Sequence, residues 1–137
     1  MKMEPSQLRE FALRYTAAWC SHDPAQVADF FSPNGSLRVN DAAPALGRAA
    51  IAEVAQSFMS AFPDIHLTMG DFLIQEDHCV FHWTLDGTNT GSGGTDHRVH
   101  IGGFELWEFG ADNLVAASRG HFDEADYLHQ LQHGFSA

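Results

Sequence analysis

The chain has 137 residues, a length that fits one domain and excludes an enzyme built from two independent cores. Apolar residues make up 45% of the sequence, which is enough to form a core and excludes wholesale disorder. The net charge of −11, with His neutral, disfavours nucleic acid and anionic membrane surfaces as partners. No stretch is long and apolar enough to cross a bilayer, so we expect a cytoplasmic protein.

Apolar residues at helical spacing predict three helices in the first half of the chain. The first covers residues 6–22, with Ser6 as its N-cap and an aromatic inner face. The second begins at Pro24 behind the capping residue Asp23 and forms a hairpin with the first. The third covers residues 51–62 and carries two apolar residues per turn.

From residue 65 onward the apolar period changes to two, which predicts strands. The predicted long strands cover residues 65–74, 79–88, 98–109 and 114–122, after a short strand at 35–40 and before a closing helix at 125–132. Gly102 and Gly103 indicate a bulge or tight bend in the third long strand. Helices followed by consecutive antiparallel strands predict an α+β domain whose curved sheet wraps around helices as an open cone.

A cluster of polar residues ends the last predicted strand. Alternation places Arg119, His121 and Asp123 on one face and Phe122 on the other. If the polar face points into the cone, Asp123 and His121 form an acid/base pair. The alternative is that this face meets solvent or a partner subunit and that Asp123 only caps the final helix.

Glu105 is a second candidate, two residues before Trp107 and on the same face of its strand. Two carboxyl groups in different surroundings can divide the roles of acid and base. The alternative is an ion pair between Glu105 and Arg98 or Arg119 across neighbouring strands.

Aromatic residues from several elements are candidates for lining an apolar ligand pocket, although each is also a candidate for the core. They are Tyr15, Trp19, Phe58, Phe62 and Trp107.

The histidines do not form a recognisable metal motif. His129 and His133 share a helical spacing and His78 and His82 are equally spaced, but no third ligand follows either pair. The two cysteines, Cys20 and Cys79, lie in no disulfide or metal pattern. We therefore expect neither a metal nor a disulfide.

Several motifs, taken in order and spacing, are similar to those of one family. They are Trp19-Cys-Ser-His-Asp-Pro24, Asp86-Gly-Thr-Asn-Thr-Gly91, Glu105-Leu-Trp-Glu-Phe109, Gly120-His-Phe-Asp123 and Gln130-Leu-Gln-His-Gly134. Over nearly its whole length, the chain resembles the SnoaL-like, polyketide (ester) cyclase branch of the nuclear transport factor 2-like superfamily.

The resemblance implies a single cone-shaped α+β domain with an apolar cavity, no cofactor, and dimers formed through the outer face of the sheet. It also implies that Asp123 is a general acid/base in an intramolecular aldol closure, with His121 beside it. A Gln and a His that the family carries on the preceding strand align here with Glu105 and Trp107. This departure leaves the aldol substrate open.

The sequence thus supports two functional hypotheses. The first is a cofactor-free cyclase, isomerase or lyase that moves a proton next to the carbonyl of a small apolar compound, with Asp123, His121 and Glu105 as catalytic residues and Arg119 as a substrate contact. The second is a noncatalytic small-ligand-binding or dimeric interaction domain. We expect a homodimer in either case, with the face that carries Phe81, Trp83 and Leu85 packed against the second subunit.

Overall fold

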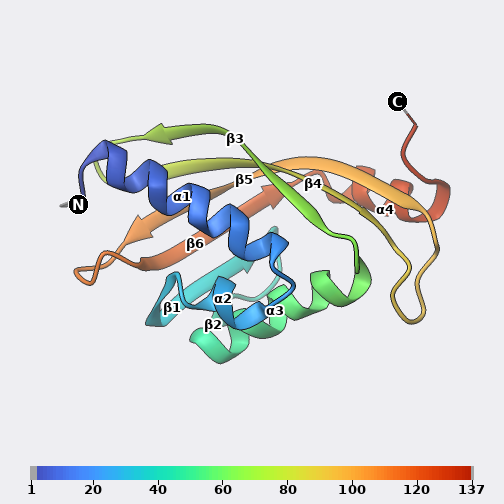
Figure 1. The fold of residues 1–137 in the computed structure, drawn as a ribbon, viewed down its shortest axis with the longest axis horizontal. Coiled ribbons are helices and arrows are strands. Elements are labelled where there is room, and N and C mark those ends of the chain that lie inside the picture. The colour runs from blue at the N-terminus through green and yellow to red at the C-terminus, as the bar shows by residue number, and fades with distance from the viewer. Residues whose placement is uncertain (1–2, 137) are drawn as a thin grey trace.

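The computed structural model describes residues 3–136, which form an α+β domain with four helices and a six-stranded sheet (Figure 1). In chain order the elements are α1 (Pro5–Cys20), α2 (Pro24–Ala28), β1 (Phe31–Val39), β2 (Ala45–Leu46), α3 (Arg48–Ala61), β3 (His66–Ile74), β4 (Cys79–Thr88), β5 (Arg98–Phe109), β6 (Val115–Phe122) and α4 (Glu124–His133). The predicted fold class is confirmed.

The sheet has the strand order β2-β1-β6-β5-β4-β3, in which β1 and β6 are parallel and the other neighbours are antiparallel. Helix α1 runs across the sheet, α2 and α3 lie beside β1 and β2, and α4 lies near the C-terminus at the far end (Figure 1). The curved sheet and the first three helices therefore enclose one interior.

The predicted helix starts are partly correct. Asp23 does cap α2, because its side chain accepts a hydrogen bond from the backbone N–H of Ala25 at 3.1 Å. Ser6 does not cap α1. The N-cap is Glu4, two residues earlier, which forms a capping box with Gln7, and Pro5 is the first helical residue. Helix α2 ends at Ala28, and the chain is already in β1 at Phe31, whose side chain is fully buried.

The predicted bulge at Gly102 and Gly103 is wrong. Strands β4 and β5 stay in continuous register there, with Trp83 opposite Gly103. A Cβ atom on Gly103 would lie 2.5 Å from the indole ring of Trp83. The glycine is therefore needed for the close approach of this ring and does not mark a bulge in the strand.

The core is dominated by aromatic rings gathered around α1. Phe81 and Trp107 stack at a centroid distance of 4.8 Å, and Tyr15 meets Trp107 edge-on at 5.1 Å. All three side chains are fully buried. Such edge-on and stacked pairs add to the free energy gained by burying the apolar area.

The prediction that Phe81, Trp83 and Leu85 pack against a second subunit is wrong. Phe81 and Leu85 are buried inside the chain, and Trp83 lines a cavity. The alternating residues Val80 and Thr84 point to the outer side, because successive strand residues face opposite ways.

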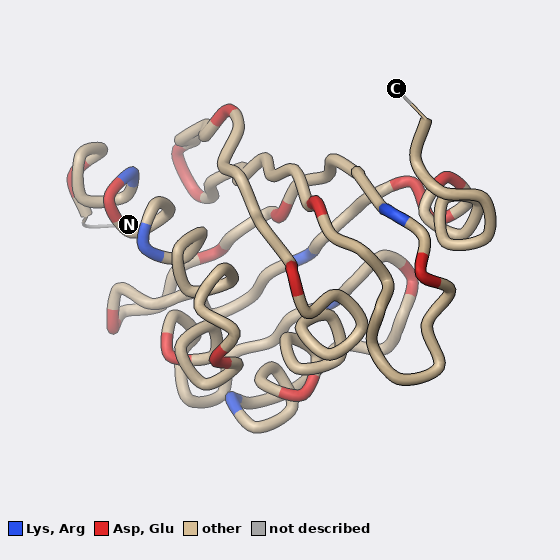
Figure 2. Tube along the Cα trace, turned by 45° about the vertical axis from the view of Figure 1, so that its right-hand side comes forward, with Lys and Arg blue, Asp and Glu red and all other residues tan. Residues whose placement is uncertain are grey.

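Two further observations concern membranes and charged partners. No helix among residues 3–136 is long and apolar enough to span a membrane. Acidic residues are distributed over the helices, strands and loops along the chain (Figure 2).

Candidate active site

A cavity of about 60 Å³ lies between α1, α3 and the inner face of the sheet. This is room for about four to six water molecules. Its aromatic walls are Trp19, Phe58, Trp83 and Phe122. Its aliphatic walls are Leu37, Val39, Val54, Leu67, Leu85 and Ile101. A single ionisable side chain, that of Glu105, completes the lining among the described residues, together with Gly120.

Glu105 is buried, with 7% of its surface exposed, and its carboxylate accepts hydrogen bonds from three buried donors. Its Oε1 atom accepts from Ser118 Oγ at 2.7 Å, from Tyr15 Oη at 3.0 Å and from Trp107 Nε1 at 3.1 Å. These donors come from three different elements, α1, β5 and β6. The carboxyl group is therefore held in one orientation by rigid parts of the fold.

The two oxygens of Glu105 differ in their partners. Oε1 accepts all three hydrogen bonds, whereas Oε2 has only a longer contact of 3.2 Å from the Tyr15 hydroxyl, which is shared with Oε1. A carboxylate oxygen can accept about two hydrogen bonds. Oε2 is therefore the oxygen with capacity for a further hydrogen bond.

Burial raises the pKa of Glu105 above its ordinary value of 4.5, against the opposing effect of the hydrogen bonds from Ser118, Trp107 and Tyr15. Burial raises the pKa of Tyr15 well above 10.0, and the charge of Glu105 raises it further. Tyr15 therefore acts as a hydrogen-bond donor near neutral pH, and Glu105 is the group poised to titrate.

Gly120 makes room beside the carboxyl group. It pairs with Glu105 across β5 and β6, and a Cβ atom at this position would lie 3.7 Å from Glu105 Cγ. A larger side chain would extend into the cavity from the same wall. The glycine thus keeps open the space next to Glu105.

Trp19, which also lines the cavity, has a buried indole N–H. Nε1 is the one buried side-chain nitrogen or oxygen atom of residues 3–136 that has no hydrogen-bond partner. Its contact with the Tyr15 hydroxyl lowers the pKa of Tyr15, although burial and the charge of Glu105 raise that pKa more strongly. The contact does not have the geometry of a good hydrogen bond.

The expectation that Arg119, His121 and Asp123 face the cavity is wrong. All three side chains are exposed, whereas Ser118 and Gly120 of the same segment are buried. Asp123 lies beyond the end of β6 and caps α4, because its carboxylate accepts the backbone N–H of Asp126 at 3.1 Å. The ring of His121 lies against Phe104, its cross-strand neighbour, at a centroid distance of 5.2 Å.

The predicted aromatic residues divide into three groups. Trp19 and Phe58 line the cavity, as expected. Tyr15 and Trp107 are not in its wall but hold the Glu105 carboxylate by hydrogen bonds. Phe62 is fully buried near Tyr127 of α4, with ring centroids 6.4 Å apart, and does not line the cavity.

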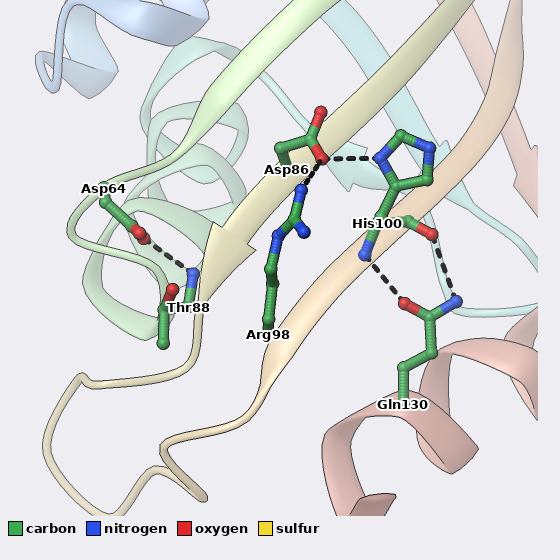
Figure 3. A network of polar contacts seen from close by, with 6 residues as sticks. All are labelled: Asp64, Asp86, Thr88, Arg98, His100 and Gln130. Carbon is green, nitrogen blue, oxygen red and sulfur yellow. Dashed lines mark hydrogen bonds and ion pairs between the residues drawn. The ribbon is translucent and has the colours of Figure 1, made fainter. Parts of the chain in front are cut away.

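A polar cluster on the outer side of the sheet contains Arg98, one of the two residues considered above as an ion-pair partner of Glu105. Asp86 binds Nδ1 of His100 and, at 3.4 Å, the guanidinium of Arg98 (Figure 3). Gln130 of α4 accepts from the backbone N–H of His100 at 2.7 Å and donates to its carbonyl oxygen at 3.1 Å. The cluster therefore fastens α4 to β5, and Glu105 takes no part in it.

The described residues contain no group of three or more His, Cys, Asp or Glu side chains placed to hold a metal ion. The rings of His129 and His133 lie together at 4.7 Å, whereas His82 binds the carbonyl oxygen of Asp71 and His78 binds Asp77.

Sequence reasoning missed several residues of the cavity wall, notably Trp83, Gly120 and Phe122, and it missed Ser118, which donates a hydrogen bond to Glu105. The signal was present in the alternation of β6, since Ser118, Gly120 and Phe122 share the face opposite to Arg119 and His121. The face with more ionisable groups was the wrong choice, because charged side chains are rarely buried unless they are paired.

The fold and its buried cavity define the class of protein. Similar solved structures are described as having a ketosteroid isomerase-like fold or a cystatin fold. A family model described as SnoaL-like polyketide cyclase matches residues 9–131, so the chain belongs to the SnoaL-like polyketide cyclase family.

Three solved structures illustrate the likeness. TsrD from Streptomyces laurentii is 19% identical with a TM-score of 0.81, and the match covers 95% of this chain and 98% of TsrD. A SnoaL-like protein from Jannaschia sp. CCS1 is 17% identical with a TM-score of 0.78 over 96% of this chain and 97% of its own.

The third is a protein from Catenulispora acidiphila DSM 44928, solved in complex with trimethylamine. It is 16% identical with a TM-score of 0.78, over 88% of this chain and 91% of its own. At these identities the likeness extends to the fold alone. No curated protein matches the chain.

Proposed function

We propose that this protein is a cofactor-free general acid/base enzyme of cyclase, isomerase or lyase type, which moves a proton next to the carbonyl group of a small apolar compound. The observation that carries the proposal is the Glu105 carboxyl group, buried in the wall of an otherwise apolar cavity and held by three donors. Buried carboxyl groups with raised pKa values are typical of acid/base catalysts.

The proposed step uses the free capacity of Glu105 Oε2. The bond between the α carbon and its hydrogen breaks, the proton passes to Oε2, and the electron pair moves into an enolate. In an isomerisation Glu105 returns the proton to another carbon atom. In a cyclisation the enolate carbon attacks a second carbonyl group, whose π electron pair moves onto its oxygen, and this oxygen takes the proton from Glu105. Ser118, Tyr15 and Trp107 fix the carboxylate during the transfer.

This proposal moves the acid/base role from Asp123 to Glu105. Asp123 and His121 are exposed, and Asp123 already accepts a backbone hydrogen bond as a helix cap. A proton transfer at Glu105 is instead shielded from water, which strengthens the electrostatic effects on the reacting groups.

The test is solvent deuterium exchange at the α carbon, screened by NMR over a panel of β-keto esters and cyclic ketones. Glu105→Gln keeps the shape of the side chain and an oxygen acceptor for Ser118 but removes the proton acceptor. We expect the exchange rate to fall about 10² to 10⁴-fold, the usual contribution of a positioned acid/base group.

Asp123→Asn is the matched control, since it makes the same chemical change at the exposed cap. We expect its exchange rate to stay close to that of the parent protein. Exchange that persists in folded Glu105→Gln, or is lost in Asp123→Asn, would contradict the assignment. Tight ligand binding by the parent protein without exchange of any compound would favour the noncatalytic binding domain.

We also propose that the protein is a cytoplasmic homodimer. The outer face of the sheet carries half-buried apolar residues, Val80, Phe104 and Leu106, which a second subunit would cover further. Light scattering at micromolar concentration should give about twice the mass of 15.1 kDa. A monomer over the whole range would contradict this expectation.

A further inference from the structure

Glu105 is a buried carboxyl group without a positively charged partner. Its three hydrogen-bond donors, Ser118, Tyr15 and Trp107, are all neutral. The ion pairs formed among residues 3–136 all involve other carboxyl groups. Because buried charges in proteins are usually paired with an opposite charge, a carboxylate in this position favours a positively charged ligand.

The cavity beside this carboxyl group has two aromatic pairs in its wall. Trp19 and Phe58 meet edge-on at a centroid distance of 6.1 Å, and Trp83 and Phe122 do so at 6.0 Å. All four side chains line the cavity. Aromatic rings attract organic cations, and ammonium groups are commonly bound among several such rings. The walls therefore suit the alkyl groups of an organic cation, and the carboxylate suits its charge.

We propose that the cavity binds small protonated tertiary amines, whose N–H group donates a hydrogen bond to Glu105 Oε2 while the alkyl groups contact the aromatic walls. Oε2 has capacity for this hydrogen bond. The cavity of about 60 Å³ limits the amine to about the size of one small ring. Binding of this kind requires no catalysis, and it would inhibit the proton transfer proposed above because it occupies the proton acceptor.

The same features disfavour other ligand classes. A primary ammonium group has three N–H donors, of which two would lie against apolar walls without acceptors. An anion would lie beside a carboxylate in a cavity that holds no other ionisable side chain of the described residues. The net charge of −11, with His neutral, also raises the concentration of cations near the protein.

Binding is coupled to the protonation of Glu105. An ammonium ion requires the carboxylate, so the proton on a neutral Glu105 leaves to water. A neutral amine instead takes this proton onto its nitrogen lone pair, and both routes give the same ion pair. The neighbours of Glu105 on α1, β4, β5 and β6 are Tyr15, Phe81, Trp107 and Ser118. Only Tyr15 among them titrates, at a pKa well above 10.0, so near neutral pH the coupling involves Glu105 alone.

The test is isothermal titration at neutral pH with N-methylpyrrolidine, a compact tertiary amine. 2-Methyltetrahydrofuran, a neutral ring of the same size, is the control for simple filling of the cavity. Glu105→Gln should lower the affinity for the amine about 10- to 100-fold, as expected for a hydrogen bond to a charged group, and should change the affinity for the ether much less. Asp123→Asn removes the same charge from an exposed carboxyl group and should leave both affinities close to those of the parent protein.

Two further measurements are made on the parent protein. Carbon-13 NMR of the Glu105 carboxyl group should give a lower titration midpoint in saturating amine, because a nearby positive charge favours the carboxylate. The affinity for the amine should change little between low and high salt, since a buried ion pair is screened much less than contacts with exposed carboxylates. The salt measurement needs no variant, so it does not depend on the folding of Glu105→Gln.

Four outcomes would overturn the inference: no binding of N-methylpyrrolidine by the parent protein, equal changes of affinity for the amine and the ether in Glu105→Gln, a Glu105 midpoint that the amine does not lower, or loss of amine binding at high salt. Amine binding without deuterium exchange of any ketone would support the inference and contradict the proposed catalytic function. Exchange that depends on Glu105 without amine binding would contradict the inference alone.

Discussion

The inner face of the sheet and the exposed segment between α3 and β3 place carboxyl groups in opposite environments. Glu105 on the inner face is buried among aromatic rings, and burial raises its pKa despite three hydrogen bonds. In the exposed segment between α3 and β3, burial also acts to raise the pKa of Asp64, but hydrogen bonds from Thr88 outweigh it and lower that pKa below 3.8 (Figure 3). The difference shows that the number of donors does not by itself determine which carboxyl group is protonated.

The largest expected effect is on stability. Glu105→Ala removes the shared acceptor of Tyr15, Trp107 and Ser118 and leaves three buried donors without partners. We expect the free energy of unfolding to fall by about 3 kcal/mol or more. Asp123→Ala removes only a helix cap and should cost about 1 kcal/mol. Urea denaturation measures the free energy of unfolding of both variants. Equal losses of stability would contradict the distinction between the buried carboxyl group of Glu105 and the exposed one of Asp123.

The second effect concerns the space beside Glu105. Gly120→Val would place methyl groups in the cavity, where a Cβ atom itself meets only ordinary contacts at 3.5 Å and beyond. We expect the affinity for a compact cyclic ketone, cyclopentanone, to fall about tenfold or more, since a single extra methylene group in an apolar pocket changes binding about 10- to 200-fold.

Gly102→Ala is the matched control, because Gly102 is exposed, on the outer side of β5. Isothermal titration should give an affinity close to that of the parent protein. Undiminished binding in Gly120→Val would place the ligand elsewhere.

The third effect is on pH dependence. Ser118→Ala removes a hydrogen bond that lowers the pKa of Glu105, so this pKa should rise further. The acid limb of the exchange rate should therefore move to higher pH, because a higher pH is needed to form the carboxylate. Ser32→Ala, which affects an exposed serine bound to Asp112, should leave the profile in place. A limb that does not move in Ser118→Ala would show that another group controls the rate.

The smallest effect is expected on the outer face. Asp86→Asn weakens the contacts with Arg98 and His100, which are partly exposed. Such pairs contribute about 1 kcal/mol or less, so thermal unfolding should change little and deuterium exchange should be unaffected. A loss of exchange comparable to that of Glu105→Gln would contradict this expectation and would indicate that the outer cluster takes part in the reaction.

Much of the fold could be predicted from the sequence, because apolar periodicity specifies which residues are helical and which alternate across a sheet. The bounds of β4 and β5 agree with the predicted strands. Which face of β6 points inward was harder to predict, because it depends on the pairing with β5, where Gly120 lies opposite Glu105. The two-residue strand β2 has no periodic signal at all.

The candidate site could be predicted only in part. Glu105, Trp19 and Phe58 were identified because they lie on apolar faces of predicted elements. The hydrogen bonds from Tyr15 and Ser118 join residues that are 90 and 13 positions from Glu105, and sequence patterns do not fix such contacts. Asp123 fitted both a catalytic role and a helix cap, and its observed contact is that of the cap.

The most direct test of the account is a carbon-13 NMR titration of the side-chain carboxyl groups in the parent protein. Assignment uses Glu105→Gln and Asp64→Asn. The account predicts that the Glu105 carboxyl group titrates above pH 4.5 and the Asp64 carboxyl group below pH 3.8 in the same sample. A midpoint for Glu105 at or below 4.5 would contradict the claim that burial poises this carboxyl group for proton transfer.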